Sequence, residues 1–279
     1  MARRIVFQGK PGAYSHLACQ QVFPDFEPLP ADAFEDAFAA VRDGSADRAM
    51  IPIENSVAGR VADIHHLMPH GGLHIIGEHF LRVNHHLLAV PGATLGDIRE
   101  VHSHIQALQQ CRRLLREQGL VPKVHADTAG AAAQVAQEGR TDQAAIASRL
   151  AADIYGLAIL RSDIEDAVHN TTRFVILARD PLELAHDQGP VITSFIFRVR
   201  NVPAALYKAL GGFATNGVNM VKLESYVDAE FNQAQFYAEI LGHPAQRAVS
   251  NAFEELVFFS HGVERLGVYP AHPFRFRRA

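Results

Sequence analysis

The chain has 279 residues, of which 48% are hydrophobic and 20% are charged, and its formal net charge is −4. This length suits two or three compact units, and the composition is that of a globular protein with a sizeable buried core. The negative charge argues against a general nucleic-acid surface, because phosphate binding needs a basic excess.

The first 180 residues alternate short apolar runs with helical patterns, which is typical of an α/β fold. Strands are predicted at residues 5–7, 48–53, 73–77, 86–90 and 144–147. Helices are predicted from about Ser15, over 33–43, from Ser103 to Gly119 and over 148–155. A chain that leaves its first lobe near Phe80 and returns near Asp163 forms two lobes. A cleft between α/β lobes is an ordinary place for a small ligand.

The pattern changes after a plausible linker between Asp180 and Gly189. Beyond it, strands are expected at 193–200, 219–227, 233–241 and 263–268, with helices from Pro203 and over 244–259. The resulting order is βαββαβ, which predicts a ferredoxin-like fold.

Cysteine and histidine usage points to a cytoplasmic protein without a metal. Cys19 and Cys111 lie in helix-like surroundings and suit reduced, buried thiols. The first strand begins at residue 5, so no signal sequence is expected, and no apolar run approaches membrane-spanning length. The 16 histidines lack the helical spacing with a carboxylate that zinc hydrolases use, so we predict no metal site.

The segment from Asn170 to Phe174 gathers polar groups at the start of an apolar strand over 174–178. It carries an amide, two hydroxyls and a fixed cation, which either cap and turn the chain or bind a small anion. Arg173 in turn either forms a surface ion pair or grips a carboxylate with two parallel hydrogen bonds.

Two further segments could cap helices or bind a ligand. Ser56 follows a predicted strand and could cap a helix, yet the same N–H groups attract carboxylates. Ser103 and Gln106 fit a capping box, and Gln110 adds a neutral donor near that helix. The turn before Ser15 is rich in glycine but lacks the spacing of dinucleotide and P-loop motifs. It is either purely structural or presents Tyr14, Ser15 and His16 to a cleft.

Taken together, these motifs resemble the prephenate dehydratase family. The similarity runs nearly end to end and rests on the following segments: Phe7-Gln8-Gly9 through His16-Leu17-Ala18, Pro52-Ile53-Glu54-Asn55-Ser56, His85 before Leu87-Leu88, Ser103-His104-x-Gln106 with Gln110-Cys111, Ala144-Ala145-Ile146-Ala147-Ser148, Ile154-Tyr155-Gly156-Leu157, and Asn170-x-Thr172-Arg173-Phe174.

The resemblance implies an α/β fold with a two-lobed, periplasmic-binding-protein-like catalytic domain followed by a βαββαβ ACT domain. The implied catalytic domain covers 1–181, with lobe 1 at about 1–79 plus 163–181 and lobe 2 at about 80–162. The implied ACT domain covers 191–270. The family converts prephenate to phenylpyruvate without a cofactor, under allosteric control by L-phenylalanine. A homodimer or homotetramer is expected, because an effector site between copies requires at least a dimer.

The resemblance also assigns roles to residues. Thr172 is the expected catalytic donor to the leaving hydroxyl. The expected substrate-binding residues are Arg173, Phe174, Asn55, Ser56, Ser103, Gln106, Gln110, Asn170 and Ser15. The expected phenylalanine-binding residues are Asn201, Ala204, Ala205, Leu206, Asn219, Glu224 and Ser225.

The regulatory motifs depart from the family pattern at Ala204, which replaces a glycine, and at Tyr226-Val227, which replace Arg-Pro. These departures leave the strength and sense of phenylalanine regulation open. Two rival functions also stay open: an arogenate dehydratase with the same fold and chemistry, and a non-catalytic amino-acid sensor.

Overall fold

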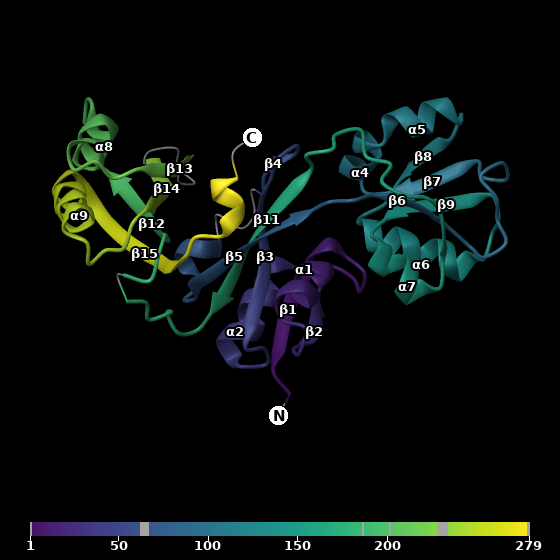
Figure 1. Cartoon of the computed structure of the whole chain (residues 1–279), viewed down its shortest axis with the longest axis horizontal. Helices are drawn as coiled ribbons and strands as arrows, with labels where there is room; N and C mark the ends of the chain where they lie inside the picture. The colour runs from purple at the N-terminus through teal and green to yellow at the C-terminus, as the bar shows by residue number, and fades with distance from the viewer. Residues whose placement is uncertain (1, 62–66, 186, 201, 228–233, 278–279) are drawn as a thin grey trace. The chain divides into compact units, whose positions relative to one another are not determined.

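The computed structural model describes residues 2–61, 67–185, 187–200, 202–227 and 234–277 (Figure 1). The chain forms two compact units, of which the first contains Met1–Val61 and His79–Phe174 and the second contains Ala62–Glu78 and Val175–Ala279. No helix among the described residues is long and apolar enough to span a membrane.

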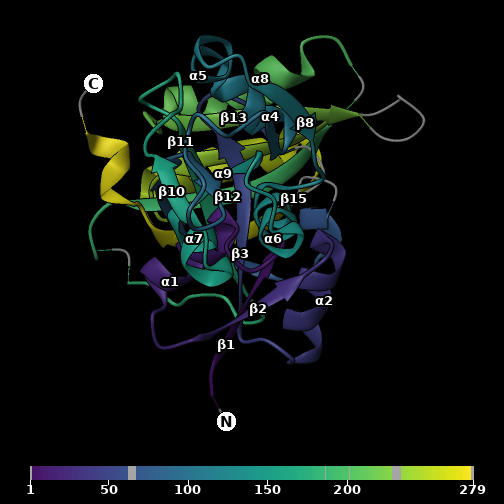
Figure 2. The same ribbon diagram turned by 90° about the vertical axis from the view of Figure 1, so that its right-hand side faces the viewer.

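A sheet with helices on both sides is formed mainly by the first unit; β1 pairs in parallel with β2 and β3, whereas β4 is antiparallel to β3. The strand order is β2-β1-β3-β11-β5, and β4 pairs with β3. Because the strand order reverses after β2, right-handed crossovers place α1 and α2 on opposite sides of this sheet, as Figure 2 shows. The elements are β1 (Arg4–Gln8), α1 (Tyr14–Val22), β2 (Glu27–Ala31), α2 (Phe34–Asp43), β3 (Arg48–Asn55), β4 (Gly59–Arg60), β5 (His74–Arg82) and β11 (Thr171–Ala178).

A second sheet, in the order β10-β6-β9-β7-β8, is also covered on both faces. Leu87 packs into the core under α4 and α5, whereas its neighbour Leu88 packs under α6 and α7, as the period of two along a strand requires. Figure 1 shows these helix pairs on opposite faces. The elements are β6 (His86–Ala89), β7 (Glu100–Ser103), α4 (Ile105–Gln110), α5 (Arg112–Glu117), β8 (Val121–Val124), α6 (Thr128–Glu138), β9 (Gln143–Ala147), α7 (Arg149–Tyr155) and β10 (Ala158–Arg161).

The loop between β1 and α1 lies directly against α7. The Ser148 hydroxyl donates to the Gly12 carbonyl at 2.5 Å, and the Tyr155 hydroxyl donates to the Pro11 carbonyl at 2.8 Å. Gly12 has a φ of +90°, and a Cβ there would lie 2.8 Å from the Cα of Ala151. Only glycine fits both the backbone conformation and this close approach.

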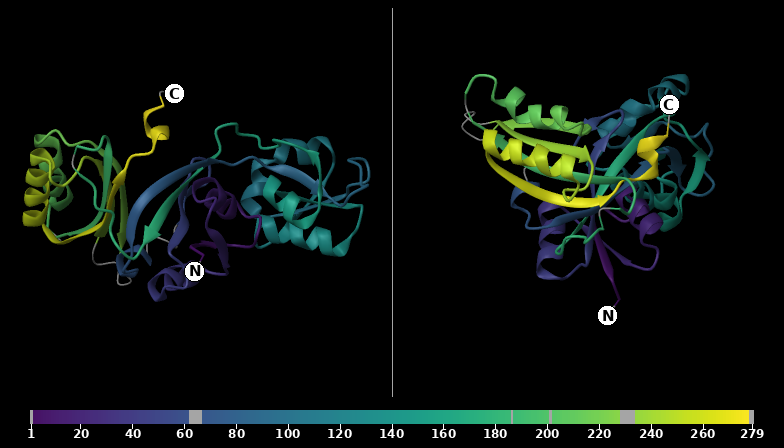
Figure 3. Two further views of the ribbon diagram at one scale, coloured as in Figure 1. Left: turned by 60° about the horizontal axis from the view of Figure 1, so that its bottom comes forward. Right: turned by 60° about the vertical axis from the view of Figure 1, so that its left-hand side comes forward.

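The second unit contains the predicted βαββαβ arrangement, so the ferredoxin-like topology is confirmed. Its antiparallel sheet runs β13-β14-β12-β15, and both helices cover the same face (Figure 3). The core between sheet and helices is rich in phenylalanine, including Phe195, Phe197, Phe213 and Phe236. The elements are β12 (Val191–Val199), α8 (Ala205–Thr215), β13 (Met220–Val227), β14 (Ala234–Leu241), α9 (Arg247–Phe259) and β15 (Ser260–Pro270), with 3-10 helices η1 (Met68–His70) and η2 (Pro273–Phe276).

Within this unit Arg275 of η2 binds two buried carboxylates. Its Nε and Nη2 donate to the two oxygens of Glu78 at 2.7 and 2.8 Å, and Nη2 also donates to Glu239 at 2.8 Å. Both glutamate side chains are 0% exposed. The Tyr237 hydroxyl donates to the other oxygen of Glu239 at 2.5 Å.

Three local predictions were wrong in detail. Ser56 caps no described helix, because Asn55 accepts backbone N–H groups in a turn that leads into β4 instead. The capping residue of α4 is His104, whose Nδ1 accepts from the Gln106 N–H at 3.3 Å. The helix predicted from Ser103 to Gly119 breaks at Cys111, whose φ of −123° is not helical. The predicted domain boundaries stay predictions.

Candidate active site

The end of β3 and the start of β11 lie side by side in the first sheet. The Ser56 N–H donates to the Thr171 carbonyl, and the Ser56 hydroxyl accepts from the Thr171 N–H, both at 2.9 Å. The same hydroxyl donates to the His169 carbonyl at 2.8 Å. These bonds bring Asn55 next to Asn170 and Thr172, which are 115 and 117 positions away in the sequence.

The orientation of the Asn55 amide is fixed by the backbone. Its Oδ1 accepts from the N–H groups of Val57 and Ala58 at 2.9 and 2.8 Å. The Nδ2 group therefore faces the other way, and it donates to Asn170 Oδ1 at 2.8 Å and to Thr172 Oγ1 at 2.9 Å. Both of its hydrogens are used by these two acceptors.

Thr172 is thereby prepared to act as a donor. Its hydroxyl oxygen accepts from Asn55, and no described residue accepts the Thr172 hydroxyl proton. Thr172 is half-buried at the start of β11. An oriented O–H group with an unused proton suits a hydrogen bond to a departing oxygen.

The same set of hydrogen bonds continues from Asn170 to Gln110 at the end of α4. Asn170, which is 1% exposed, donates through Nδ2 to Gln110 Oε1 at 2.7 Å. Gln110 Oε1 also lies 2.9 Å from His85 Nε2. Residues of the first sheet and of the second are thus joined by neutral side chains.

His85 and Tyr14 complete this network. The Tyr14 hydroxyl lies 2.7 Å from His85 Nδ1 and 2.9 Å from the Asn84 carbonyl oxygen. Burial lowers the pKa of His85 and raises the pKa of Tyr14 well above its ordinary value, so both side chains are neutral near pH 7. The backbone N–H of His85 donates to the Glu165 carboxylate at 2.9 Å.

Arg173 lies beside this network with its charge already paired. Its side chain is 3% exposed, and Nη1 donates to Glu54 Oε1 at 3.0 Å. The guanidinium also lies 5.9 Å from the centre of the Phe80 ring. The Glu54 side chain is 35% exposed, so one member of the pair reaches solvent.

The other predicted substrate-binding residues differ in access. Ser103 is 0% exposed and donates to the Ile146 carbonyl at 2.6 Å, and Phe174 is 1% exposed in the core. Ser15 lies in the first turn of α1 and is 8% exposed, whereas Gln106 is exposed on α4. The structure therefore brings Asn55, Gln110, Asn170 and Thr172 into one network and leaves these four outside it.

The site residues selected from the sequence included neither His85 nor Tyr14, although the turn before Ser15 was given as a possible means of presenting Tyr14 to a cleft. His85 stands among 16 histidines, and only its place before Leu87-Leu88 in the family resemblance set it apart. Tyr14 is the first residue of α1, directly after the glycine-rich turn, and its neighbour Ser15 was selected instead.

The predicted regulatory residues lie in the second unit, except Asn201, which is outside the described residues. Ala204 precedes α8 with a φ of +61°, and Ala205 and Leu206 form the first turn of that helix. Asn219 precedes β13, while Glu224 and Ser225 lie on it. Glu224 accepts from the Tyr226 hydroxyl at 2.8 Å and pairs with Lys222 at 2.6 Å.

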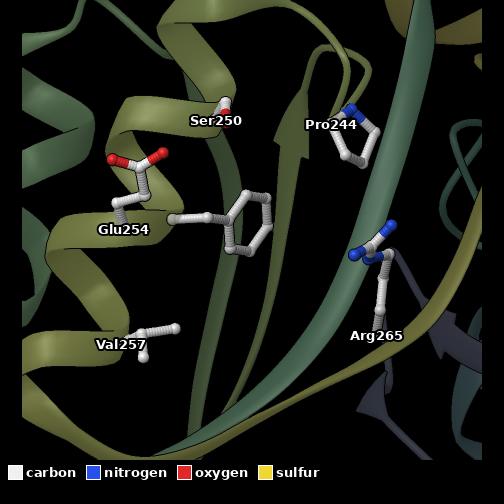
Figure 4. A pocket seen from close by; sticks show the side chains of 6 residues that line it. Pro244, Ser250, Glu254, Val257 and Arg265 are labelled. Carbon is white, nitrogen blue, oxygen red and sulfur yellow. The ribbon is translucent and has the colours of Figure 1, made fainter.

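An open pocket of about 370 Å³ lies between α9 and β15 in the second unit (Figure 4). Its lining combines apolar side chains with one cation, Arg265, and one anion, Glu254. None of the predicted substrate-binding or phenylalanine-binding residues lines this pocket.

Comparison with protein families and curated relatives identifies consistent similarities. Residues 5–182 match the family model described as prephenate dehydratase. A bifunctional N-acyl-homoserine lactone acylase/prephenate dehydratase of Komagataeibacter europaeus is 53% identical over 274 residues, covering 98% of each chain. Arogenate dehydratase/prephenate dehydratase 2 of Arabidopsis thaliana is 39% identical over 277 residues, covering 96% of this chain and 72% of the relative.

A solved structure gives the same result for the fold. The prephenate dehydratase of Arthrobacter aurescens, determined in complex with L-Phe, superposes with a TM-score of 0.88 at 31% identity. The match covers 96% of this chain and 90% of that chain. The two-lobed α/β fold class expected from the sequence is confirmed.

Proposed function

Because the chain belongs to the prephenate dehydratase family, we propose that it converts prephenate to phenylpyruvate, water and carbon dioxide. The observation that carries this proposal is the Thr172 hydroxyl, which Asn55 holds by its oxygen while its proton stays available. The reaction needs a donor of this kind at the departing hydroxyl of the substrate.

The chemistry requires positioning more than it requires a strong acid. As the ring carboxylate leaves as carbon dioxide, the electron pair of the broken C–C bond moves through the diene. The hydroxyl on the opposite carbon leaves with its bonding pair and takes up a proton to become water. The product ring is aromatic, so an enzyme that holds the dianion correctly and stabilises the departing oxygen accelerates the step.

We assign the donor to Thr172 and the supporting role to its neighbours. Thr172 donates to the departing oxygen, and Asn55 and Asn170 hold Thr172 and Gln110 in place. Gln110 keeps its Nε2 group for the substrate, since only its Oε1 is engaged by described residues. All of these donors are neutral.

Arg173 stays our candidate for a substrate carboxylate. Its buried guanidinium is paired with Glu54, whose side chain is partly exposed. Substrate binding would replace the Glu54 carboxylate by the substrate carboxylate, which keeps the buried cation paired throughout. The predicted contacts of Phe174, Ser56, Ser103, Gln106 and Ser15 remain proposals with less structural support.

The test replaces Thr172 and its neighbour Thr171. Thr172→Ala is expected to lower kcat by roughly a hundredfold or more, because one oriented donor is lost. Thr172→Ser keeps the hydroxyl and is expected to retain much of the activity. Thr171→Ala is the matched control, since the Thr171 hydroxyl makes only a 3.3 Å bond to the His169 carbonyl. Near-normal phenylpyruvate formation by Thr172→Ala would exclude this role.

Arogenate is the alternative substrate, which the plant relative's name supports. Arogenate carries an ammonium group where prephenate has a keto group, and none of the network residues distinguishes the two. Comparing kcat/KM for both substrates decides between them. Ligand binding without turnover of either substrate would instead support the amino-acid sensor.

The name of the Komagataeibacter relative suggests a second activity to test. Hydrolysis of an N-acyl-homoserine lactone by the wild-type protein and by Thr172→Ala would show whether this chain shares that activity and whether it uses the same site.

We propose further that the ferredoxin-like domain is an ACT domain and binds L-phenylalanine between copies of a homodimer or homotetramer. The L-Phe complex of the Arthrobacter relative supports this effector. Ala204 and the engagement of Glu224 by Tyr226 change two of the positions involved. Calorimetry without heat, together with unchanged kinetics in the presence of phenylalanine, would reject the proposal.

A further inference from the structure

We propose that His85 is a positioning residue, which donates through Nε2–H to Gln110 Oε1 and so holds the Gln110 Nε2 group ready for substrate. The inference rests on the function proposed above and names a residue that the sequence did not select. His85 lies between β5 and β6, in the segment that leads from the first sheet into the second.

The direction of each hydrogen bond follows from the backbone. The N–H groups of Val57 and Ala58 can only donate, so the Asn55 oxygen must face them. Asn55 Nδ2 then faces Asn170, which must present its own oxygen at 2.8 Å.

The same reasoning fixes the second half of the chain of bonds. With its oxygen toward Asn55, Asn170 presents Nδ2 to Gln110, so Gln110 must present Oε1 at 2.7 Å. His85 Nε2 lies 2.9 Å from this oxygen and must therefore carry a hydrogen. A bare Nε2 would place two lone pairs against each other.

In this tautomer the single Tyr14 hydroxyl hydrogen faces two acceptors, His85 Nδ1 and the Asn84 carbonyl oxygen at 2.9 Å. A neutral imidazole with Nε2–H leaves Nδ1 as an acceptor, and the Tyr14 hydroxyl, 2.7 Å away, is close enough to share its hydrogen between Nδ1 and the Asn84 carbonyl. The tautomer itself therefore rests on the bonds that fix Gln110 Oε1. His85 is 3% exposed, and its lowered pKa agrees with a neutral ring. Tyr14 belongs to α1, whereas Gln110 belongs to α4, so the imidazole connects helices that pack on different sheets.

Gln110 is the residue whose orientation depends on this bond. Two donors, Asn170 Nδ2 and His85 Nε2–H, meet at its Oε1, so a flipped amide would place NH₂ against both. Without the His85 donor, one of these two restraints is lost. The Nε2 group of Gln110 has no acceptor among the described residues, so it is available to a bound substrate.

The test compares two substitutions of His85 that reach different ring nitrogens. A glutamine side chain reaches as far as Nε2 and can donate to Gln110, while asparagine reaches only as far as Nδ1. We expect His85→Asn to lower kcat roughly ten- to a hundredfold with little change in KM. The substitution leaves the Gln110 Nε2 donor in the site but lets it move out of position. His85→Gln should restore most of kcat.

The neighbouring His86 provides the matched control, because it is 4% exposed and its Nδ1 accepts from the Asp163 N–H, which lies outside the network. His86→Gln and His86→Asn should not differ in kcat. Equal losses for the two His85 variants, with unfolding temperatures like that of wild type, would overturn the positioning role.

A second readout does not depend on turnover. In the wild-type protein, ¹⁵N NMR of the His85 ring should show a protonated Nε2 and a bare Nδ1 near pH 7. A bare Nε2 would overturn the inference. Failure of the wild type to consume prephenate would contradict the proposed function instead, while leaving this tautomer measurable.

Discussion

Replacing Arg275 by methionine should destabilise the second unit, because two buried carboxylates would lose a shared cation. Arg275 donates to both oxygens of Glu78 and to one oxygen of Glu239, at 2.7–2.8 Å. Methionine keeps most of the apolar stem and removes only the charged head. Removing one partner of a buried ion pair typically costs about 3–5 kcal/mol.

The size of the effect makes it easy to measure. A loss of about 3–5 kcal/mol corresponds to a fall in unfolding temperature on the order of 10 °C. The chain has no tryptophan, so tyrosine signals in near-ultraviolet circular dichroism are a suitable probe. Tyr237 and Tyr269 are buried in this unit, and the Tyr237 hydroxyl bonds to Glu239 itself.

A control lies two positions away. Arg277 is exposed, and its guanidinium lies 5.6 Å from the centre of the Phe274 ring, so Arg277→Met should change the stability by less than about 0.5 kcal/mol. Equal unfolding temperatures for Arg275→Met and Arg277→Met would refute the reasoning. In that case the two carboxylates would not need the cation in the folded protein.

Two further perturbations test the pH response and a strained residue. The His16 Nδ1 accepts from the Gly12 N–H at 3.1 Å, and burial lowers the pKa of this histidine in the folded protein. Below the ordinary histidine pKa of about 6.5, the unfolded chain therefore binds a proton at His16 more readily than the folded protein does. Stability should therefore fall as pH decreases from 7.5 to 5.5. The His16→Asn variant keeps an acceptor that does not titrate in this range, so its unfolding temperature should decline less steeply with pH. An unchanged slope would contradict this. Ala204→Gly should raise stability by up to about 1 kcal/mol in denaturant unfolding, because relief of the φ of +61° outweighs the greater freedom of glycine in the unfolded chain. A lower midpoint would show that the methyl group contributes packing.

Prediction from sequence succeeded where the pattern was local. The alternation of Phe195 and Phe197 identified β12, and the order of strands and helices after residue 190 gave the ferredoxin-like topology. Two strands were missed because they contain proline. β2 carries Pro28 and Pro30 and β8 carries Pro122, yet both are the end strands of their sheets, where a missing N–H is tolerated.

The sequence selected candidate site residues but could not predict the hydrogen bonds among them. The family resemblance selected Asn55, Gln110, Asn170 and Thr172 one by one. The bonds that join them connect residues 60–117 positions apart, so their direction depends on how the sheets pack. The pairing of Arg173 with Glu54, 119 positions away, was invisible for the same reason.

The contact between the β1–α1 loop and α7 is one of the restraints that hold the two sheets of the first unit together. Ser148 and Tyr155 hold the carbonyl groups of Pro11 and Gly12, which are backbone atoms that every loop sequence provides. The attachment therefore survives most changes of loop side chains and depends on Ser148, which caps α7, and on Tyr155, which ends it. A motion that separated the loop from α7 would first have to break these two bonds.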